Sequence, residues 1–380
     1  MPVISKNKQA GVLFEEMNFN GSDRVIILNK PKLLEMVDAA CEQNSLQTIR
    51  EAVFNLKTQL SNFKADKKGL LNIGTNGDTV VVNQRHLFDE LRQIVESRTL
   101  ERAKYYLRRL HKGVSEQRTS KINDLNLNRW KEYEDIITDS LWVLKKRDNS
   151  GVHTADYWGN FIPQIPNQMM KRYTKKGECV LDTFAGCGTT LIEAQRLGRN
   201  CIGIELQRKI VEIANNLIKS EPNCFDSVNE VIEGDSSDVD YKDLLARYGQ
   251  KSVQLLIMHP PYFDIIKFSN DPRDLSNCKS VDDFLSKMNL IISRAAKVLD
   301  KGRYLALVIG DKYCKGEWIP LGFLTMQQII KNGFVLKSII VKNFEETFGK
   351  RNQKELWRYR AIVGGFYIFK HEYIFLFSKY

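Results

Sequence analysis

The stretch Glu178-Cys-Val-Leu-Asp-Thr-Phe-Ala-Gly-Cys-Gly-Thr-Thr190 decides the fold of this 380-residue chain. The apolar residues CVLD predict a buried strand, the glycines predict a tight loop, and the following LIEAQRLG predicts a helix. Such a loop lets a ligand approach the backbone, because Gly186 and Gly188 carry no Cβ and can take positive φ. The spacing is neither G-x-G-x-x-G nor G-x-x-x-x-G-K-[ST], which argues against a dinucleotide or a nucleoside triphosphate as the ligand.

Further apolar runs follow this stretch and alternate with segments of helical period. They are CIGIEL (201–206), VQLLIMH (253–259), YLALVIGD (304–311), LKSIIVKNF (336–344) and YIFLFSK (373–379). Alternating strands and helices predict an α/β domain over residues 151–380, with an open, mostly parallel sheet and flanking helices.

Residues 1–150 differ in character from the rest of the chain. Segments 31–64 and 84–147 are rich in helix-forming residues with apolar positions three and four apart, so a mainly helical N-terminal domain is predicted. Between them, GTNGDTVVVNQ (74–84) predicts a turn and a short strand in a small local hairpin. The domain boundary is predicted near DNSG (148–151), and no internal repeat is recognised.

The composition is that of an ordinary globular protein, with 43% hydrophobic and 27% charged residues. No stretch approaches the roughly 20 uncharged apolar residues of a membrane helix. The N-terminus MPVISKNKQAG also lacks the apolar run of a secretory signal, so a cytoplasmic protein without a membrane partner is predicted. The seven cysteines form no C-x-x-C pair and the five histidines are scattered, so neither a disulfide framework nor a metal is expected.

The formal net charge of +11 is unevenly distributed along the chain. It divides into about +5 for residues 1–150, −3 for 151–250 and +9 for 251–380. An acidic middle between basic flanks is expected if a small-molecule pocket is surrounded by a surface that faces phosphates. A basic flank can equally be a solvated surface with no such partner.

Acidic residues close three predicted strands: Asp182, then Glu205 23 residues later, and Asp235 in IEGDSS. Since parallel strands end at one edge of a sheet, these carboxylates outline a nucleoside-shaped pocket, in which Glu205 would accept hydrogen bonds from ribose hydroxyls. The alternative interpretation of Glu205 and Asp235 is a helix cap or a solvated turn.

The segment His259-Pro260-Pro261-Tyr262-Phe-Asp follows the apolar run LLIM. Two prolines keep the chain extended and remove two N–H donors, which leaves nearby carbonyls as acceptors. Acceptors beside an aromatic ring suit a planar substrate with an exocyclic amino group, which would donate to them while the base stacks on Tyr262. A plain turn out of the strand is the alternative, and the glycine loop upstream weighs against it.

The motifs DTFAGCGTT and HPPYF together resemble the S-adenosylmethionine-dependent DNA amino-methyltransferases, which methylate N6 of adenine or N4 of cytosine. The cofactor loop of that family is D-P-F-x-G-x-G-T-T and its catalytic motif is [D/N/S]-P-P-[Y/F/W]. The resemblance covers about residues 153–380 and implies a Rossmann-like methyltransferase fold, S-adenosylmethionine as cofactor and DNA as substrate. In this chain Thr183 and Cys187 replace the usual proline and serine, and His259 replaces the usual acid, amide or hydroxyl residue.

The resemblance also implies the residues of the site. Those that would bind the cofactor are Asp182, Phe184, Gly186, Gly188, Thr189, Glu205, Asp235, Asn160, Phe161 and Pro163. In this set the glycine loop would hold the methionine part, Glu205 the ribose and Asp235 the adenine. The target base would be held by His259, Pro260, Pro261 and Tyr262.

Histidine at position 259 affects the expected chemistry. A base amine is a poor nucleophile because its lone pair is delocalised into the ring, and neutral His259 with the Pro260 carbonyl would accept its protons and favour in-line transfer. With an unperturbed histidine pKa of about 6.5, activity is expected to fall below about pH 6.5. A stacked base cannot reach such a pocket, so base flipping is implied for double-stranded DNA.

Three segments combine basic with aromatic or polar residues that suit DNA: a predicted helix at 98–112, the stretch 342–360 and a predicted loop at 265–280. The individual candidates are Arg108, Arg109, Lys350, Arg351, Arg358 and Arg360. Each segment could instead be a solvated face. Only about 120 residues follow the HPPY motif, most of them needed to complete the sheet, so target reading is assigned to residues 1–150, assisted by 342–360.

The predicted function is therefore site-specific DNA methylation of the restriction-modification or orphan type, with a cognate restriction endonuclease as a candidate partner. The sequence indicates neither the target base nor the oligomeric state. One alternative is an RNA methyltransferase acting on a guanine amine, although no RNA-binding module is recognised. A second alternative, methylation of a protein glutamine, is less favoured because that activity usually goes with the motif N-P-P-Y. A third alternative is a nucleic-acid-binding protein whose catalysis is impaired by His259.

Overall fold

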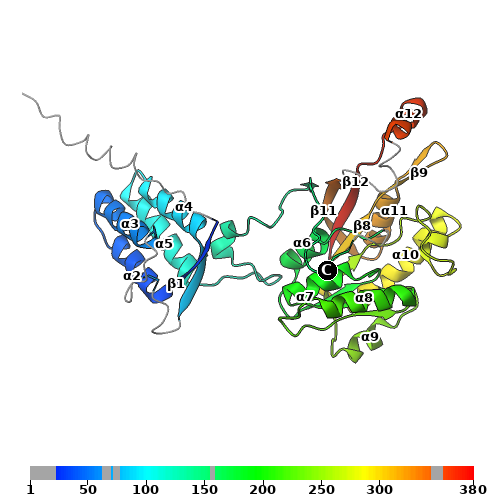
Figure 1. Ribbon diagram of the computed structural model, residues 1–380, viewed down its shortest axis with the longest axis horizontal. Helices are drawn as coiled ribbons and strands as arrows, with labels where there is room; N and C mark the ends of the chain where they lie inside the picture. Colours follow the sequence, from blue (N-terminus) through cyan, green and yellow to red (C-terminus); the bar gives the residue numbers. More distant parts are fainter. Residues whose placement is uncertain (1–22, 62–69, 72–77, 155–158, 344–353) are drawn as a thin grey trace, which may run out of the picture. The chain divides into compact units, whose positions relative to one another are not determined.

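The computed structural model describes residues 23–61, 70–71, 78–154, 159–343 and 354–380 (Figure 1). The chain forms an N-terminal unit, residues 1–120 and 125–134, and a sheet unit, residues 121–124 and 135–380. The division precedes the predicted boundary near 148–151. The reason is that Leu141–Trp142 (β3) pair with a strand of the large sheet, which makes the residues around them part of the sheet unit.

The N-terminal unit contains two copies of one pattern, a five-residue strand followed by helices of 12 and 16 residues. The first copy is β1 (Val25–Asn29), α2 (Lys30–Cys41) and α3 (Leu46–Ser61); the second is β2 (Thr79–Asn83), α4 (Gln84–Val95) and α5 (Leu100–Ser115). The two strands pair with each other, antiparallel. The short strand predicted within 74–84 is present as β2, but it pairs with the distant β1 and not within a local hairpin, while the predicted turn at 74–77 lies outside the described residues.

Equivalent residues have the same roles in the two copies. Each strand ends in an asparagine, Asn29 or Asn83, whose side chain accepts a hydrogen bond from the N–H three residues on, at 3.0 and 3.3 Å, and so caps the next helix. The second helix of each copy buries the same positions, for example Leu56 and Leu110. The expectation of no internal repeat is wrong, because the two copies share a burial pattern. The repeat was not recognised in the sequence because the copies have few identical residues.

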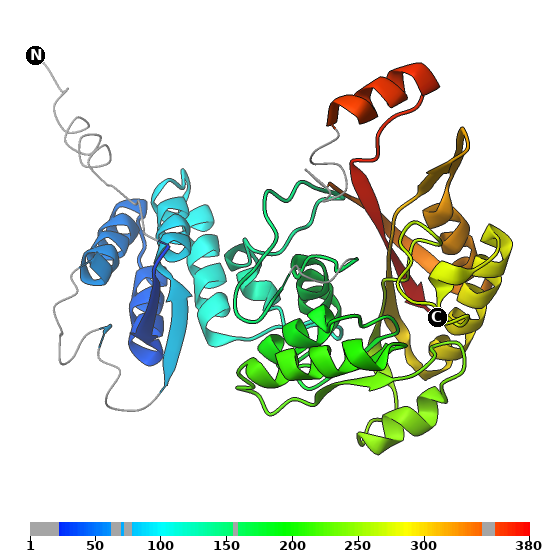
Figure 2. The same ribbon diagram turned by 45° about the vertical axis from the view of Figure 1, so that its right-hand side comes forward.

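The sheet unit is built around an eight-stranded sheet with the order β3-β11-β12-β8-β7-β4-β5-β6 (Figure 2). Its other strands are β4 (Cys179–Asp182), β5 (Asn200–Glu205), β6 (Asn229–Glu233), β7 (Val253–Met258), β8 (Leu299–Ile309), β11 (Phe334–Asn343) and β12 (His371–Lys379). All neighbours pair in parallel except β12, which runs antiparallel to both β8 and β11. The predicted α/β fold with an open, mostly parallel sheet is confirmed.

Helices cover both faces of this sheet. One core packs α6 (Gln164–Tyr173), α7 (Thr189–Leu197) and α8 (Arg208–Ser220) on one face, and another packs α9 (Tyr241–Arg247), α10 (Val281–Ala295) and α11 (Leu321–Lys331) on the other. Side chains that alternate along a strand supply both cores, as Val180 and Leu181 of β4 do. This two-sided burial explains why the strands read as continuous apolar runs.

Shorter elements complete the sheet unit. They are the antiparallel pair β9 (Lys312–Cys314) and β10 (Glu317–Ile319), the helix α12 (Lys354–Gly364), and the short 3₁₀ turns Leu275–Asn277 and Ala296–Val298. In the N-terminal unit a further 3₁₀ turn spans Leu127–Glu132. Within the described residues, none of the helices combines the length and the apolar character needed to cross a membrane.

The strand β3 provides a test of the boundary between the N-terminal unit and the sheet unit. Trp142 is 1% exposed, and its Nε1 donates to the carbonyl of Asp139 at 2.9 Å, whereas the adjacent Leu141 is 61% exposed. We expect Trp142→Ala to lower the free energy of unfolding of the sheet unit by about 3 to 5 kcal/mol, because it empties a buried aromatic site. Leu141→Ala, the matched control, should change it by less than about 0.5 kcal/mol. Urea unfolding followed by circular dichroism measures both, and equal effects would contradict the assignment of β3.

Candidate active site

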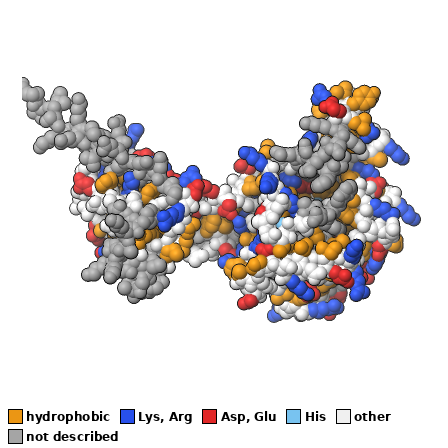
Figure 3. Space-filling view, viewed as in Figure 1, with side chains coloured by type: hydrophobic (Ala, Val, Ile, Leu, Met, Phe, Trp, Pro, Cys, Tyr) orange, Lys and Arg blue, Asp and Glu red, His pale blue; other side chains and the backbone are white. Residues whose placement is uncertain are grey.

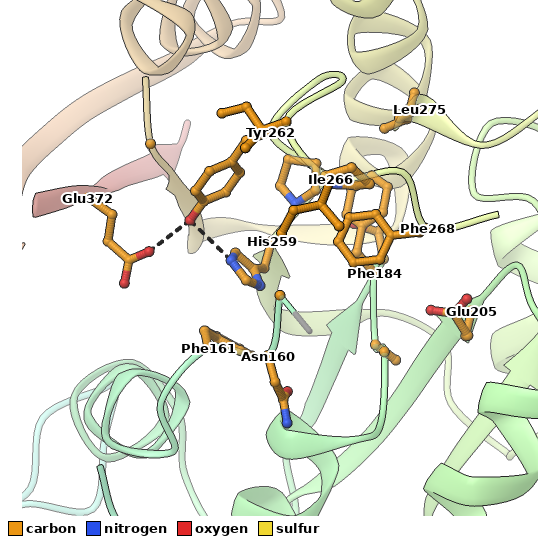
Figure 4. A pocket seen from close by; sticks show the side chains of 18 of the residues that line it. Asn160, Phe161, Phe184, Glu205, His259, Tyr262, Ile266, Phe268, Leu275 and Glu372 are labelled. Atoms are coloured by element: carbon orange, nitrogen blue, oxygen red, sulfur yellow. Dashed lines mark hydrogen bonds between the residues drawn. The ribbon is translucent and has the colours of Figure 1, made fainter. Parts of the chain in front are cut away.

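A cavity of about 1240 Å³ opens at the carboxyl ends of β4, β5, β6 and β7 (Figure 4). Drug-sized ligands occupy cavities of roughly 300 to 1,000 Å³, so there is room here for a cofactor and a base together. The residues from the sequence prediction that line it are Asn160, Phe161, Phe184, Gly186, Glu205, Asp235, His259, Pro260, Pro261 and Tyr262. Those that lie outside its lining are Pro163, Asp182, Gly188 and Thr189.

The glycine loop connects β4 to α7. Gly186 and Gly188 have φ angles of 50° and 83°, in the left-handed region that glycine adopts without strain. Asp182 is completely buried beneath the loop, where its Oδ1 accepts from the N–H of Phe184 at 2.9 Å and burial raises its pKa to about 6. Asp182 therefore shapes the loop from below, while Gly188 and Thr189 begin α7 behind it.

A glycine of the neighbouring strand, Gly203 in β5, makes room for this loop. A Cβ at that position would lie 2.7 Å from Cβ of Ala185 and 2.9 Å from a methyl group of Leu191, closer than side chains approach in proteins. The loop and the start of α7 thus pack directly on the backbone of β5. Nothing in the run CIGIEL singles out Gly203, because one glycine in an apolar run does not indicate what faces it.

Two of the carboxylates that line the cavity were predicted from the sequence, Glu205 at the end of β5 and Asp235 after β6. Glu205 accepts from the N–H of Gln207 at 2.9 Å, and burial raises its pKa. Asp235 accepts from the N–H and the hydroxyl of Ser237 at 2.8 and 2.7 Å. Each residue lines the cavity and also stabilises a turn, so the turn interpretation applies to both, and their binding of a nucleoside stays a prediction.

Asn160 and Phe161 form another wall. The Oδ1 of Asn160 accepts from the hydroxyl of Thr189 at 2.8 Å, which ties this wall to the start of α7. The ring of Phe161 stacks on that of His259, with the centroids 4.7 Å apart and the planes 26° from parallel. Pro163 is buried at the N-terminus of α6 and supports this segment rather than facing the cavity.

Arg147 lines the same wall, although the sequence did not point to it. Its guanidinium donates to the carbonyls of Phe161 and Thr154 at 2.9 and 3.0 Å, and burial lowers its pKa. Through these bonds Arg147 joins the segment before α6 to the chain that leaves β3. Its only sequence signal is its place in the basic run LKKRD, which does not distinguish it from its neighbours.

The His-Pro-Pro-Tyr segment leaves the end of β7 and lines the cavity. Nε2 of His259 lies 3.1 Å from the hydroxyl of Tyr262 (Figure 4). Burial lowers the pKa of His259 to about 4; Lys342 also lowers it and Glu372 opposes the shift. The imidazole is therefore neutral at pH 7 and can accept a hydrogen bond. This pKa lies below the unperturbed value of about 6.5 assumed from the sequence, so the expected fall in activity moves to lower pH, towards 4.

Two more residues of the site are Lys342, which was expected only as the first residue of the DNA-contact stretch 342–360, and Glu372, which was not predicted. They lie opposite each other on β11 and β12, they are 6% and 5% exposed, and Nζ of Lys342 lies 2.9 Å from Oε1 of Glu372. The other carboxylate oxygen, Oε2, accepts from the hydroxyl of Tyr262 at 2.8 Å. The only sequence signal was a charged residue within or beside an apolar run, LKSIIVKNF and HEYIFLF.

The basic candidates differ in their surroundings. Arg108 of α5 is exposed, but Arg109 forms an ion pair with Glu90 of α4. Arg358 and Arg360 are exposed on α12. On the face shown in Figure 3, lysine and arginine side chains are interspersed with acidic ones on both units. Lys350 and Arg351 lie outside the described residues, so the structure does not bear on them.

The chain belongs to the N6/N4 family of DNA methylases, whose family model, described as DNA methylase, matches residues 14–216 and 253–380. The resemblance drawn from DTFAGCGTT and HPPYF is thereby confirmed. The match extends into the N-terminal unit, beyond the part of the chain on which those motifs lie.

Similar curated proteins include the Type II methyltransferase M.HindIII of Haemophilus influenzae, 36% identical over 108 residues, which are 27% of this chain and 33% of that protein. M2.DpnII of Streptococcus pneumoniae is 34% identical over 99 residues, 25% of this chain and 34% of that protein. The uncharacterized protein MJ1233 of Methanocaldococcus jannaschii is 37% identical over 177 residues, 46% of this chain and 51% of that protein. The matches thus span about a third to a half of these relatives.

A solved methyltransferase structure from Pyrococcus furiosus matches 58% of this chain and 83% of its own, with a TM-score of 0.36 and 15% identity. Membership of the DNA methylase family confirms S-adenosylmethionine as the cofactor. The residues present fit this group, because the glycine loop admits a close approach and the carboxylate of Glu205 can accept from ribose hydroxyls. The carboxylate of Asp235 is a further acceptor on the same cavity.

The low pKa of His259 can be tested directly by NMR titration. We expect the ring signals of His259, identified by their loss in His259→Asn, to stay constant between pH 7.5 and 5.5, where a free histidine titrates at about 6.5. Because the folded-state pKa lies below the unfolded one, the free energy of unfolding should fall as the pH drops from about 6.5 towards 4, and less so in His259→Asn. A midpoint near 6.5 in the folded protein would contradict the burial argument.

Proposed function

We propose that this chain is a site-specific DNA methyltransferase that moves a methyl group from S-adenosylmethionine to the exocyclic amino group of a base flipped out of the duplex. The observation that carries the proposal is that the segment His259–Tyr262 lines the same cavity as the glycine loop and Glu205. A methyl donor held by the loop and a base held by the segment would share one cavity. Membership of the DNA methylase family supports the same reaction.

In this proposal the protein activates the amine. Bound S-adenosylmethionine supplies an electrophilic methyl group. The neutral imidazole of His259 and the carbonyl of Pro260 accept hydrogen bonds from the amine, which restores lone-pair character to a nitrogen otherwise conjugated with the ring. Transfer of the methyl group would break its bond to the sulfonium sulfur and release S-adenosylhomocysteine. The nitrogen, now bonded to the methyl carbon, carries a surplus proton, which passes to His259 and then to solvent. The ring of Tyr262 would stack on the base and hold it in place.

The target atom is N6 of adenine or N4 of cytosine. Both are exocyclic amines next to a ring nitrogen, and the acceptors offered by His259 and Pro260 suit either. A duplex substrate requires flipping, because a stacked base cannot enter the cavity. A DNA substrate places the protein in the cytoplasm, and the names of the curated relatives, Type II methyltransferases, support a cognate restriction endonuclease as a partner.

Target reading is assigned to the N-terminal unit, assisted by α12. The exposed Arg108 supports a contact of α5 with phosphates, while Arg109 is engaged by Glu90 and is expected to contribute less. On α12, Arg358 and Arg360 accompany Tyr359, which is 65% exposed, a combination that suits phosphate and base contacts. Most of the described residues after the His-Pro-Pro-Tyr segment belong to the sheet and its helices.

The reaction can be tested by sequencing that detects modified bases in DNA from cells expressing the chain. We expect N6-methyladenine or N4-methylcytosine at one short motif, and its loss with Tyr262→Ala, which removes the stacking ring. Tyr380→Ala is a matched control, because that tyrosine is 70% exposed and lies outside the cavity. Unmodified DNA with the wild-type chain, or full modification with Tyr262→Ala, would contradict the proposal.

The role of α12 can be tested by the salt dependence of DNA binding. Each phosphate contact contributes about −0.9 to the slope of log K against log salt concentration, so Arg358→Gln combined with Arg360→Gln should reduce its magnitude by up to about 1.8. Cofactor affinity should not change with these substitutions. Arg247→Gln on α9 is a suitable control, because that arginine is also exposed and forms an ion pair with Asp243 of its own helix. An unchanged slope in the double variant would remove α12 from the DNA interface.

A further inference from the structure

Four polar side chains form a connected chain at the cavity, of which Figure 4 shows His259, Tyr262 and Glu372. Nε2 of His259 lies 3.1 Å from the hydroxyl oxygen of Tyr262, and that hydroxyl lies 2.8 Å from Oε2 of Glu372. Oε1 of Glu372 in turn lies 2.9 Å from Nζ of Lys342. All four groups come from the same edge of the sheet, at the ends of β7 and β11 and the start of β12.

The direction of each hydrogen bond in this chain is determined by its charged end. Lysine can only donate and a carboxylate can only accept, so Lys342 and Tyr262 both donate to Glu372. The phenol of Tyr262 has a single proton, which it donates to Glu372 in this arrangement. The contact between Tyr262 and His259 is then a hydrogen bond only if Nε2 of His259 carries the imidazole proton.

The other ring nitrogen of His259 is thereby left with a lone pair. A neutral imidazole has one N–H and one acceptor nitrogen, so a proton on Nε2 makes Nδ1 the acceptor. The ring cannot easily turn over to exchange the two nitrogens, because it is stacked on Phe161 and its edge meets the ring of Tyr262, with planes 83° apart. Among the described residues Nδ1 has no hydrogen-bond partner, and the side chain lines the cavity.

We propose that the buried pair Lys342–Glu372 positions the catalytic base: through Tyr262 it keeps His259 in the Nε2–H tautomer, so that Nδ1 accepts the proton of the target amine. This inference rests on the proposed methyl transfer. The residues usually found at position 259, an acid, an amide or a hydroxyl, all carry an acceptor oxygen. A histidine offers an acceptor there only in one tautomer, and the ion pair selects it.

The burial of the pair explains why the selection is strong. Lys342 and Glu372 are each about 95% buried and face each other across two antiparallel strands, so neither can move to solvent or exchange partners with other side chains easily. A buried charge without its partner is costly, which keeps the carboxylate in place as the acceptor of the phenol proton. Lys342 and Glu372 are therefore positioning residues that act through Tyr262.

The substitution Glu372→Gln tests this assignment, because it keeps the shape of the side chain and leaves one acceptor oxygen. Lys342 can only donate and should take that oxygen, which turns the new NH₂ group towards Tyr262. The phenol would accept from the NH₂ group and donate its own proton to Nε2 of His259, so that the imidazole proton moves to Nδ1. The variant should therefore hold the wrong tautomer in a nearly unchanged site.

Two measurements report on the tautomer of His259 and on its effect on catalysis. In protein labelled with ¹⁵N-histidine, long-range proton–nitrogen correlations distinguish the protonated from the unprotonated ring nitrogen, and His259→Asn identifies the signals among the five histidines. The wild type should have the proton on Nε2 and Glu372→Gln should have it on Nδ1. The turnover number on DNA should fall on the order of 100-fold or more in Glu372→Gln, as expected when a general base presents the wrong tautomer, with the dissociation constant of S-adenosylmethionine unchanged.

Glu230→Gln is the matched control. The hydroxyl of Tyr248 donates to Oε2 of Glu230 at 2.9 Å, so the same type of tyrosine–carboxylate bond is altered, but neither residue lines the cavity. This control should leave the tautomer, the turnover number and the cofactor affinity unchanged. A nearly normal turnover number for Glu372→Gln, or a wild-type protein with the proton on Nδ1, would overturn the positioning role.

If Glu372→Gln fails to fold, Tyr262→Phe interrupts the same chain and leaves the ion pair intact. It should yield a mixture of both tautomers of His259, and a ring held entirely in the Nε2–H form would overturn the inference. The NMR readout does not depend on methyl transfer. Suppose that the wild-type protein modifies no DNA, but that the tautomer of His259 differs between the wild type and Glu372→Gln. This result would refute the proposed function while supporting the control of His259 by Glu372.

Discussion

The parallel pairing of β4 with β5 and with β7 is the constraint on which the site depends. Parallel strands end at the same edge of a sheet, so the glycine loop, Glu205 and His259 meet there although the sequence separates them widely. The loop can lie against β5 only because Gly203 has no side chain. A change in the pairing of β4 would therefore separate the two halves of the cavity, the part that fits a cofactor and the part that fits a base.

A single antiparallel strand adds what the parallel strands cannot supply. Because β12 runs opposite to β8 and β11, its first residues, and not its last, lie at the edge where the cavity opens. Glu372 is thereby placed opposite Lys342 and within hydrogen-bonding distance of Tyr262. A parallel strand in the same place would carry its N-terminal residues to the far edge. His259 would then be a neutral ring with no charged group to select its tautomer.

The sequence predicted those parts of the fold and site that depend on local signals. Apolar runs alternating with helical segments indicated the sheet, and the glycine loop and the segment His259–Tyr262 are contiguous motifs that line the cavity. Lys342 and Glu372 could not be predicted, because they are 30 residues apart and meet only through the register of two strands. The pKa of His259 could not be predicted either, because it depends on burial. The two-residue strand β3 was too short to signal the boundary.

The duplication in the N-terminal unit was hidden for a different physical reason, and it bears on what this unit does. Packing requires apolar residues at given positions, not identical ones, so the two copies kept their burial pattern while their surfaces diverged. Of the two equivalent 16-residue helices, α3 carries two lysine or arginine residues and one acidic residue, whereas α5 carries five lysine or arginine residues and one acidic residue. The fold of the unit does not require this charge, because α3 packs in the equivalent place without it. Packing therefore does not explain the basic surface of α5, whereas the proposed contact of this helix with phosphates would.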